Sequence, residues 1–204
     1  QAALLADAVS TPYAAVVHTA QVHMGNTVAV WGVGGVGAHL VQLSKLAGAV
    51  PVIAVDLNDA VLERAKRLGA DYAFRSDDPD LMKKIEDITD GRMVDIAFDA
   101  VGIQPTLRAC VESLDINGKA VSIGLSPQNI DAGTFLEFNL KKKQLLGHLG
   151  YKRQDIARLA DMLSYGRLDL TESISKIIPL TDIKQGIDDL ENHRGNPIRI
   201  LVKP

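Results

Sequence analysis

The glycines of one short segment are spaced so that the backbone can approach a phosphate group closely. In Gly32-x-Gly34-x-x-Gly37, the first glycine permits a tight turn, the second leaves room for a pyrophosphate, and the third lets a helix pack closely. The N-terminus of that helix would direct free N–H groups and a positive dipole end at the phosphates. The expected phosphate-binding residues are Gly32, Gly34, Gly35, Val36 and Gly37.

An acidic residue follows these glycines at the spacing of a ribose-binding carboxylate. Asp56 ends the apolar run 52–55 and lies about 20 residues beyond Gly37. A carboxylate there accepts hydrogen bonds from the adenosine ribose and repels a 2′-phosphate, so the sequence predicts NAD rather than NADP as the cofactor. The alternative interpretations are a glycine-rich turn that binds nothing and, for Asp56, an acid in the N-cap region of the next helix.

The segments around the glycines alternate between apolar strands and amphipathic helices. Strands are expected at 27–31, 52–56, 71–74, 94–98, 119–123 and 144–149, and helices at 38–47, 59–68, 80–88, 106–114 and 155–165. This alternation predicts an α/β fold with a doubly wound parallel sheet of the Rossmann type. Ligands of such sheets bind at the carboxyl ends of the strands, where the strand order reverses. The stretch 124–138 is expected to be irregular.

Two terminal segments lie outside this alternation. Residues 1–22 have a helical pattern with a break at Ser10-Thr-Pro12. We therefore expect a helical lead-in at 1–22, a nucleotide-binding domain at 23–172 and a separate C-terminal segment at 173–204. In that last segment the expected elements are a strand at 175–178, a helix at 182–190, a turn at 193–197 and a strand at 198–202.

The composition argues against several classes of partner. The 204 residues are 47% hydrophobic and 23% charged, with a net charge of −3. This balance argues against nucleic acid or an anionic membrane as a binding partner. The basic cluster Lys141–Lys143 is expected to be a solvent-exposed segment that leads into a strand, and not a binding patch. The single cysteine, Cys110, allows no internal disulfide and is expected to be a packed core thiol.

The sequence shows neither a membrane-spanning run nor a secretory leader, so the expected location is cytoplasmic. The chain starts at Gln1, directly within a helical pattern. We therefore expect it to be part of a longer protein.

A series of motifs, taken together and in order, resembles the C-terminal, cofactor-binding portion of the zinc-containing medium-chain alcohol dehydrogenases. The motifs are Leu4–Asp7, Ser10–Tyr13, Gly32–Gly37, Ile53–Asp56, Leu68–Asp71, Val94–Gly102, Gly118–Gly124, Gly147–Gly150 and Gly195–Arg199. The resemblance implies an NAD-dependent oxidoreductase that transfers a hydride between an alcohol and nicotinamide, with zinc assisting. It also implies that both terminal segments complete a GroES-like catalytic domain, whose N-terminal part is not contained in these residues.

The resemblance also implies roles for individual residues. Asp7, three positions before Ser10, corresponds to a ligand of the catalytic zinc, and Thr11 to a catalytic-site threonine beside the nicotinamide. The alternative for Asp7 is an N-cap or a solvated helix residue. Arg199 corresponds to an arginine that reaches the pyrophosphate, and it could equally pair with a surface acid. The residues expected around the nicotinamide ring are Ala100, Val101, Ile123, Gly124 and Leu125.

The histidines and the single tryptophan give weaker signals. His148 stands where relatives often have serine, and we expect a neutral histidine at a strand end rather than a catalytic one. His39, on the helix after the glycines, is expected to be structural or exposed. Trp31 ends the first strand and is expected to lie in the core, close to a bound cofactor.

Two other functional classes remain open. Zinc-free relatives similar to quinone or enoyl reductases usually lack a ligand at the Asp7 position and tend to prefer NADP, so Asp7 and Asp56 argue against them. A dinucleotide-binding protein without catalysis is the second alternative, because a fold does not by itself imply a function. The apolar edge strand 144–149 is expected to pair with a second copy in a dimer or tetramer. The substrate remains open among primary and secondary alcohols, polyols and aldehydes.

Overall fold

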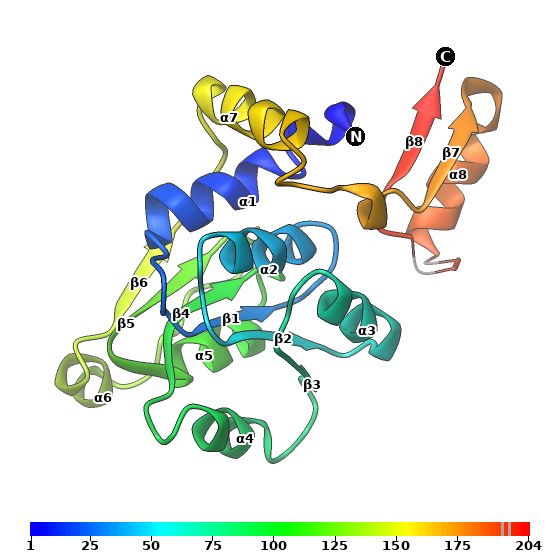
Figure 1. Cartoon of the computed structure of the whole chain (residues 1–204). Coiled ribbons are helices and arrows are strands. Elements are labelled where there is room, and N and C mark those ends of the chain that lie inside the picture. The colour runs from blue at the N-terminus through cyan, green and yellow to red at the C-terminus, as the bar shows by residue number, and fades with distance from the viewer. Residues whose placement is uncertain (193, 196) are drawn as a thin grey trace.

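A six-stranded parallel sheet forms the centre of the computed structural model, which describes residues 1–192, 194–195 and 197–204 (Figure 1). The strands are β1 Val28–Trp31, β2 Val52–Asp56, β3 Tyr72–Arg75, β4 Val94–Asp99, β5 Leu114–Ser122 and β6 Gln144–Gly147. Their order in the sheet is β3-β2-β1-β4-β5-β6, which is the order of a doubly wound dinucleotide-binding fold. The expected α/β fold class is therefore confirmed.

The central strands form because their apolar residues can be buried on both faces of the sheet. Every residue of β1 is buried, and β1 pairs in parallel with β2 and β4. Val28 and Val30 enter the hydrophobic cluster on one face, whereas Ala29 and Trp31 enter the cluster on the other. Continuous apolar runs of this kind are typical of parallel strands with helices on both sides. The strand order reverses between β1 and β4, which opens a crevice at their carboxyl ends.

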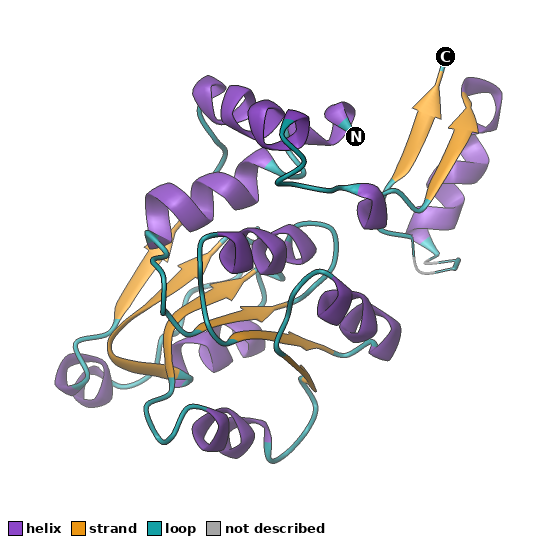
Figure 2. Ribbon diagram, viewed as in Figure 1, coloured by secondary structure: helices purple, strands orange, loops and turns teal. Residues whose placement is uncertain are grey.

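Helices cover both faces of the sheet (Figures 1 and 2). The helices are α1 Ser10–Ala14, α2 Gly37–Leu46, α3 Asp59–Arg67, α4 Leu81–Ile88, α5 Gln104–Glu112, α6 Phe135–Leu140 and α7 Arg153–Ser164. In Figure 1, α1, α2, α3 and α7 lie on one side of the sheet, and α4 and α5 lie on the other. Asn58 caps α3, since its Oδ1 accepts a hydrogen bond from Ala60 N at 2.9 Å. Within the described ranges, no helix is long and apolar enough to cross a membrane.

The N-terminal segment breaks at a different place from the one predicted. The 3-10 helix η1 (Ala2–Leu5) is followed by residues 6–9 and then by α1, which continues directly into the π-helix η2 (Ala15–Ala20). Pro12 lies in the first turn of α1, where backbone N–H groups lack intrahelical partners, so its missing N–H does not interrupt the helix. The break therefore lies at residues 6–9, before Ser10, instead of at Ser10–Pro12 as predicted.

The C-terminal segment forms its own two-stranded parallel sheet (Figure 1). Its elements are η3 Thr171–Ser173, β7 Lys176–Pro179, η4 Leu180–Asp182, α8 Ile183–Glu191 and β8 Ile200–Lys203. The predicted order of strand, helix and strand is confirmed. The predicted turn 193–197 includes His193 and Asn196, which lie outside the described residues.

The structure corrects the predicted end of the helix 106–114 and the predicted start of the fifth strand. α5 ends at Glu112, and β5 begins at Leu114 instead of at 119. The strand extends farther because Leu114 pairs with Val94 across a register irregularity that the apolar pattern did not reveal. The packed core positions of Trp31 and Cys110 are as expected, since both side chains are buried.

The stretch before β6 is more ordered than predicted. α6 starts at Phe135 behind Thr134, whose Oγ1 accepts a hydrogen bond from Glu137 N at 3.3 Å. The expectation of a solvated Lys141–Lys143 cluster was wrong for Lys143, whose side chain is buried. Its Nζ donates to Val111 O at 2.7 Å and to Glu137 Oε1 at 2.9 Å, so α6 is fastened to the end of α5.

Candidate functional site

The turn between β1 and α2 has the geometry that the glycine spacing predicts. A Cβ on Gly37 would overlap the carbonyl oxygen of Gly32, so only glycine lets α2 start this close to the strand. Gly32 has a φ of +80°, which favours glycine. A Cβ on Gly34 would meet no atom within 4 Å. The backbone at Gly34 therefore faces open space, where a phosphate group has room to approach.

Asp56 turns its carboxylate toward the same glycine-rich turn. Its Oδ2 accepts a hydrogen bond from Val33 N at 2.8 Å, and its Oδ1 accepts one from Asn58 N at 3.0 Å. The carboxylate is thus fixed at the carboxyl end of β2, beside the turn that follows β1. A ribose attached to a phosphate at the turn would meet this carboxylate first.

Arg199 brings a positive charge to the turn from the C-terminal segment. Its guanidinium lies so close to Gly35 that a Cβ there would be 2.9 Å from Cζ and would overlap Nη1. Nη1 donates to the neighbouring Ile198 O at 3.1 Å. Burial lowers the pKa of Arg199, and the negative charge of Asp7 partly opposes this shift. An anionic ligand would therefore stabilise the charged form of this half-buried guanidinium.

A cavity of about 500 Å³ unites these residues at the point where the strand order reverses. Its lining consists of Gly32, Gly34, Gly35, Val36, Gly37, Asp56, Ala100, Val101 and Arg199. All of these are sequence-predicted cofactor-binding residues, and they come from the ends of β1, β2 and β4 and from the C-terminal segment. The structure thus brings phosphate-facing glycines, a carboxylate and a guanidinium together around one space.

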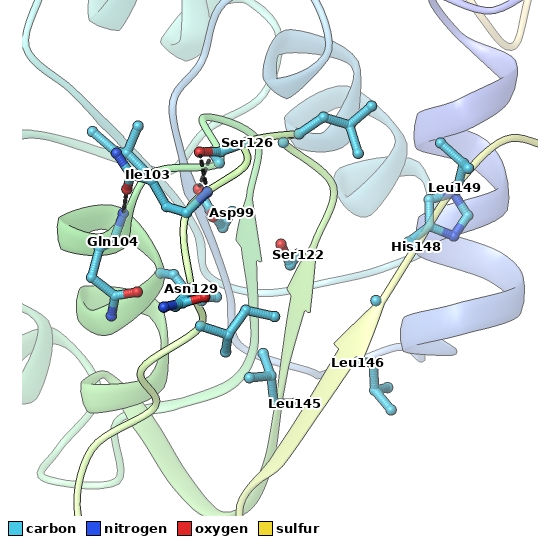
Figure 3. A pocket seen from close by; sticks show the side chains of 17 residues that line it. Asp99, Ile103, Gln104, Ser122, Ser126, Asn129, Leu145, Leu146, His148 and Leu149 are labelled. Atoms are coloured by element: carbon cyan, nitrogen blue, oxygen red, sulfur yellow. Dashed lines mark hydrogen bonds between the residues drawn. The ribbon is translucent and has the colours of Figure 1, made fainter.

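A second cavity, of about 420 Å³, lies at the carboxyl ends of β4, β5 and β6 (Figure 3). Gly124 and Leu125 line it, together with Gly147 and His148. Ile123 is buried beside it and is held by its backbone, since Ile123 N donates to Asp99 O at 2.9 Å. The predicted nicotinamide-side residues are therefore divided between the two cavities.

Asp99 organises the loop between the two cavities, and sequence reasoning missed it. Its buried Oδ1 accepts hydrogen bonds from Val101 N and Gly102 N, both at 3.1 Å, and from Thr106 Oγ1 at 2.9 Å. The backbones of Gly102 and Gly124 then meet so closely that neither position has room for a Cβ. The available signal was an acidic residue at the end of a buried strand, three positions before a glycine.

Asp7 and Thr11 lie next to each other at the start of α1. Thr11 Oγ1 donates to Asp7 Oδ1 at 2.7 Å, and the Asp7 side chain is otherwise exposed. Among the described residues, no three His, Cys, Asp or Glu side chains gather in a way that could hold a metal ion. A zinc ion at Asp7 would therefore need its remaining ligands from outside this part of the chain.

Three of the histidines, His18, His39 and His148, take structural positions. His39 is fully buried in α2, so of the two expectations the structural one holds. His148 lies at the end of β6 with both ring nitrogens hydrogen-bonded, Nε2 to Thr11 O at 3.1 Å and Nδ1 to Thr19 Oγ1 at 2.8 Å. His18 Nε2 lies 2.9 Å from Asp155 Oδ1.

Comparisons with known proteins find relatives of this chain among the dehydrogenases. The family model described as zinc-binding dehydrogenase matches residues 35–165. Probable S-(hydroxymethyl)glutathione dehydrogenase 1 from Schizosaccharomyces pombe is 35% identical over 211 residues, which cover 98% of this chain and 53% of the relative. Alcohol dehydrogenase from Cupriavidus necator is 29% identical over 187 residues, which cover 91% of this chain and 51% of the relative.

A solved alcohol dehydrogenase from Thermus sp. ATN1 shares the fold. It superposes with a TM-score of 0.91 at 24% identity, over 100% of this chain and 58% of the other. The chain thus spans about half the length of the curated relatives that it matches. Since the family model matches well over half of the 204 residues, the chain belongs to the zinc-binding dehydrogenase family.

Proposed function

We propose that this chain is the cofactor-binding part of an NAD-dependent, zinc-assisted alcohol dehydrogenase. The observation that carries the proposal is the cavity in which the Gly32–Gly37 turn, Asp56 and Arg199 converge. The family membership and the dehydrogenase relatives support it. The full-length enzyme would interconvert an alcohol with an aldehyde or ketone.

The residues around the cavity fit a dinucleotide. The backbone N–H groups at the start of α2 would bind the pyrophosphate, with the Arg199 guanidinium as its counter-charge. Asp56 would accept hydrogen bonds from the adenosine ribose hydroxyls. The loops 100–101 and 123–125 would hold the nicotinamide end with their backbone groups. The protein's contribution to hydride transfer would then be the alignment of two carbon atoms.

Asp56 supports NAD over NADP as the cofactor. Its fixed carboxylate would repel a 2′-phosphate, and an exposed leucine, Leu57, follows it in place of a cation. We expect kcat/KM with NAD to exceed that with NADP. Asp56→Ser should lower kcat/KM for NAD by roughly 10- to 100-fold, because hydrogen bonds to a charged acceptor are lost. A variant that keeps the wild-type ratio of the two cofactors would contradict this assignment.

Asp7 is the proposed zinc ligand of this chain, with the remaining ligands coming from a preceding catalytic domain. An exposed carboxylate is an acceptable oxygen ligand for zinc. A zinc ion bound there would polarise the substrate oxygen as a Lewis acid. Thr11, which holds Asp7 through its hydroxyl, would lie beside the nicotinamide.

The two terminal segments, 1–22 and 173–204, are proposed to complete that catalytic domain. β7 and β8 form a sheet of two strands only, which is marginal unless more structure packs against it. Apolar side chains on this segment are exposed, among them Ile177 at 63% and Ile187 at 50%. A preceding domain would bury them.

We further propose that the protein is a homo-oligomer, either a dimer or a tetramer. β6 is an edge of the sheet, and α6 beside it exposes Phe135, Leu136 and Leu140 at 88, 70 and 71%. An exposed apolar edge of this kind needs a partner or a cover. A monomer in light scattering at micromolar concentration would refute this proposal.

The deciding experiment measures zinc content and NAD-dependent alcohol oxidation in the full-length protein and in its Asp7→Ala variant. We expect about one zinc ion or more per chain, with one equivalent and the activity lost in the variant. A protein without zinc that reduces quinones or enoyl substrates would favour the zinc-free class. Cofactor binding without any turnover would favour the binding-only class.

A further inference from the structure

His148 connects the end of β6 to the N-terminal helical segment through both of its ring nitrogens. Nε2 donates to the backbone oxygen of Thr11 at 3.1 Å, and Nδ1 accepts from Thr19 Oγ1 at 2.8 Å. The backbone N of His148 donates to Ser122 O at 2.9 Å, which ties the residue to β5 as well. Figure 3 shows the imidazole beside the N-terminal helix, at the far end of the second cavity from Gln104.

The helical segment that His148 contacts has an unusual conformation. Thr19 belongs to the π-helix η2, and π-helical turns are rare and often found at functional sites. The segment ends at Gln21 with a φ of 56°, in the left-handed region. His18, on the same turn, is hydrogen-bonded to Asp155 of α7 at 2.9 Å. Two consecutive residues of the π-turn are thus fastened to two different elements.

The hydrogen bonds of His148 continue to both parts of the proposed active site. On one side, Thr11 donates from Oγ1 to Asp7 Oδ1 at 2.7 Å, so the residue that His148 holds also holds the proposed zinc ligand. On the other side, Ser122 immediately precedes Ile123, where the loop proposed for the nicotinamide begins. One imidazole therefore lies between the segment of Asp7 and the cofactor loop.

We propose that His148 is a positioning residue that sets the Asp7–Thr11 segment against the nicotinamide end of the cofactor. This inference rests on the proposed dehydrogenase function. A carbonyl oxygen can only accept, so Nε2 carries the proton in the bond to Thr11 O, and in the neutral ring Nδ1 then accepts from Thr19 Oγ1. Both nitrogens are thus occupied, and neither is free to exchange a proton with a substrate. The Thr11 bond sets the position of the helix, whereas the Thr19 bond occupies the second nitrogen and is not required for that position.

The two nitrogens can be tested separately in the full-length enzyme. In His148→Gln the amide nitrogen can replace Nε2 and keep the Thr11 bond, whereas His148→Asn can replace only Nδ1. Thr19→Val removes the hydroxyl with little change of shape. We expect kcat for alcohol oxidation to fall roughly 10- to 100-fold in His148→Ala and His148→Asn, the range typical of a misplaced reacting group. His148→Gln and Thr19→Val should stay within about threefold of the wild type, and KM for NAD should change little in all four.

A second readout does not depend on activity. Hydrogen exchange of the backbone amides of residues 11–22 should accelerate in His148→Ala and His148→Asn, and should stay near the wild-type rate in His148→Gln. His23→Ala, at an exposed histidine outside these contacts, is the matched control and should exchange like the wild type.

The outcomes separate this inference from the proposed function. A wild-type protein without alcohol oxidation would refute the proposed function, and the exchange measurement would still test the role of His148. Unchanged exchange in His148→Ala would overturn the inference whatever the activity. Equal losses of kcat in the alanine, asparagine and glutamine variants, or rescue by asparagine alone, would also overturn it.

Discussion

Acidification is expected to destabilise the protein through His39, which is buried in α2 just behind the glycine turn. None of the ring is exposed to solvent, and neither ring nitrogen has a hydrogen-bond partner among the described residues. Burial and, to a smaller extent, the positive charge of Arg199 lower the pKa of His39 from 6.5 to about 4. The Gln42 amide favours the protonated ring, but its Oε1 lies outside hydrogen-bond geometry and does not restore the pKa.

The direction of the pH effect follows from the two pKa values. Since the folded-state pKa lies below the unfolded one, the unfolded chain binds more protons between these values. The contribution of neutral His39 to the free energy of unfolding is fully present above pH 6.5 and is lost as the pH falls toward about 4. This corresponds to about 3 kcal/mol across the whole window, and to about 2 kcal/mol between pH 7 and pH 5.

Urea unfolding of the wild type and of His39→Leu at pH 7 and pH 5 measures this contribution. The variant keeps an apolar side chain in α2 and removes the titrating group. The wild type should lose about 2 kcal/mol more of its free energy of unfolding between the two pH values than the variant does. His23→Gln, at an exposed histidine, is the control and should follow the wild type. Equal pH dependence in the wild type and His39→Leu would refute the reasoning.

Three further perturbations test the surroundings of the site. Gly37→Ala should unfold the protein, because the new Cβ would overlap a carbonyl oxygen. Gly34→Ala should keep the thermal midpoint of unfolding but weaken NADH binding, measured by calorimetry, at least about tenfold. Identical behaviour of the two variants would contradict this expectation. Glu137→Gln should cost about 1–3 kcal/mol in urea unfolding at neutral pH, since it removes the counter-charge of buried Lys143. The Lys143 ammonium lowers the pKa of Glu137 below its ordinary 4.5, so this cost should be complete above pH 4.5 and shrink as the pH falls below it toward the lowered pKa. A constant cost would argue against the ion pair. Asp99→Ala should lower the free energy of unfolding by about 2–4 kcal/mol because three donors lose their acceptor, and Asp99→Asn should lose clearly less.

Local patterns in the sequence were sufficient to predict the sheet and the position of the glycine turn. The parallel, doubly wound character of the sheet follows from the alternation of apolar strands and helices, because parallel neighbours need such crossovers. The sequence also predicted that the three glycines and the carboxylate lie together, because both strands concerned end at the same crevice. These residues are Gly32, Gly34, Gly37 and Asp56. These are short-range features, and the structure places all four around one cavity.

Features that depend on contacts between distant segments could not be predicted in the same way. The burial of Lys143 depends on Val111 O, and the sequence gives no sign that this carbonyl faces it. The contacts of His148 with Thr11 and Thr19 join residues more than a hundred positions apart. α6 is a partial exception, because Thr134 and Glu137 have the spacing of a helix N-cap signal that could have been recognised.

The two terminal segments meet electrostatically at the same edge of the sheet. Asp7 comes from the segment before β1 and Arg199 from the segment before β8, yet the charge of Asp7 opposes the lowering of the pKa of Arg199 by burial. Neutralisation of Asp7 by a bound cation would remove that support from the guanidinium, and an anionic pyrophosphate beside Gly35 would replace it. Through its charge, Asp7, the proposed metal ligand, therefore favours the charged form of Arg199, the arginine proposed to bind the pyrophosphate. For this reason we expect both terminal segments to contribute charge to the proposed cofactor site, beside the strand–helix core.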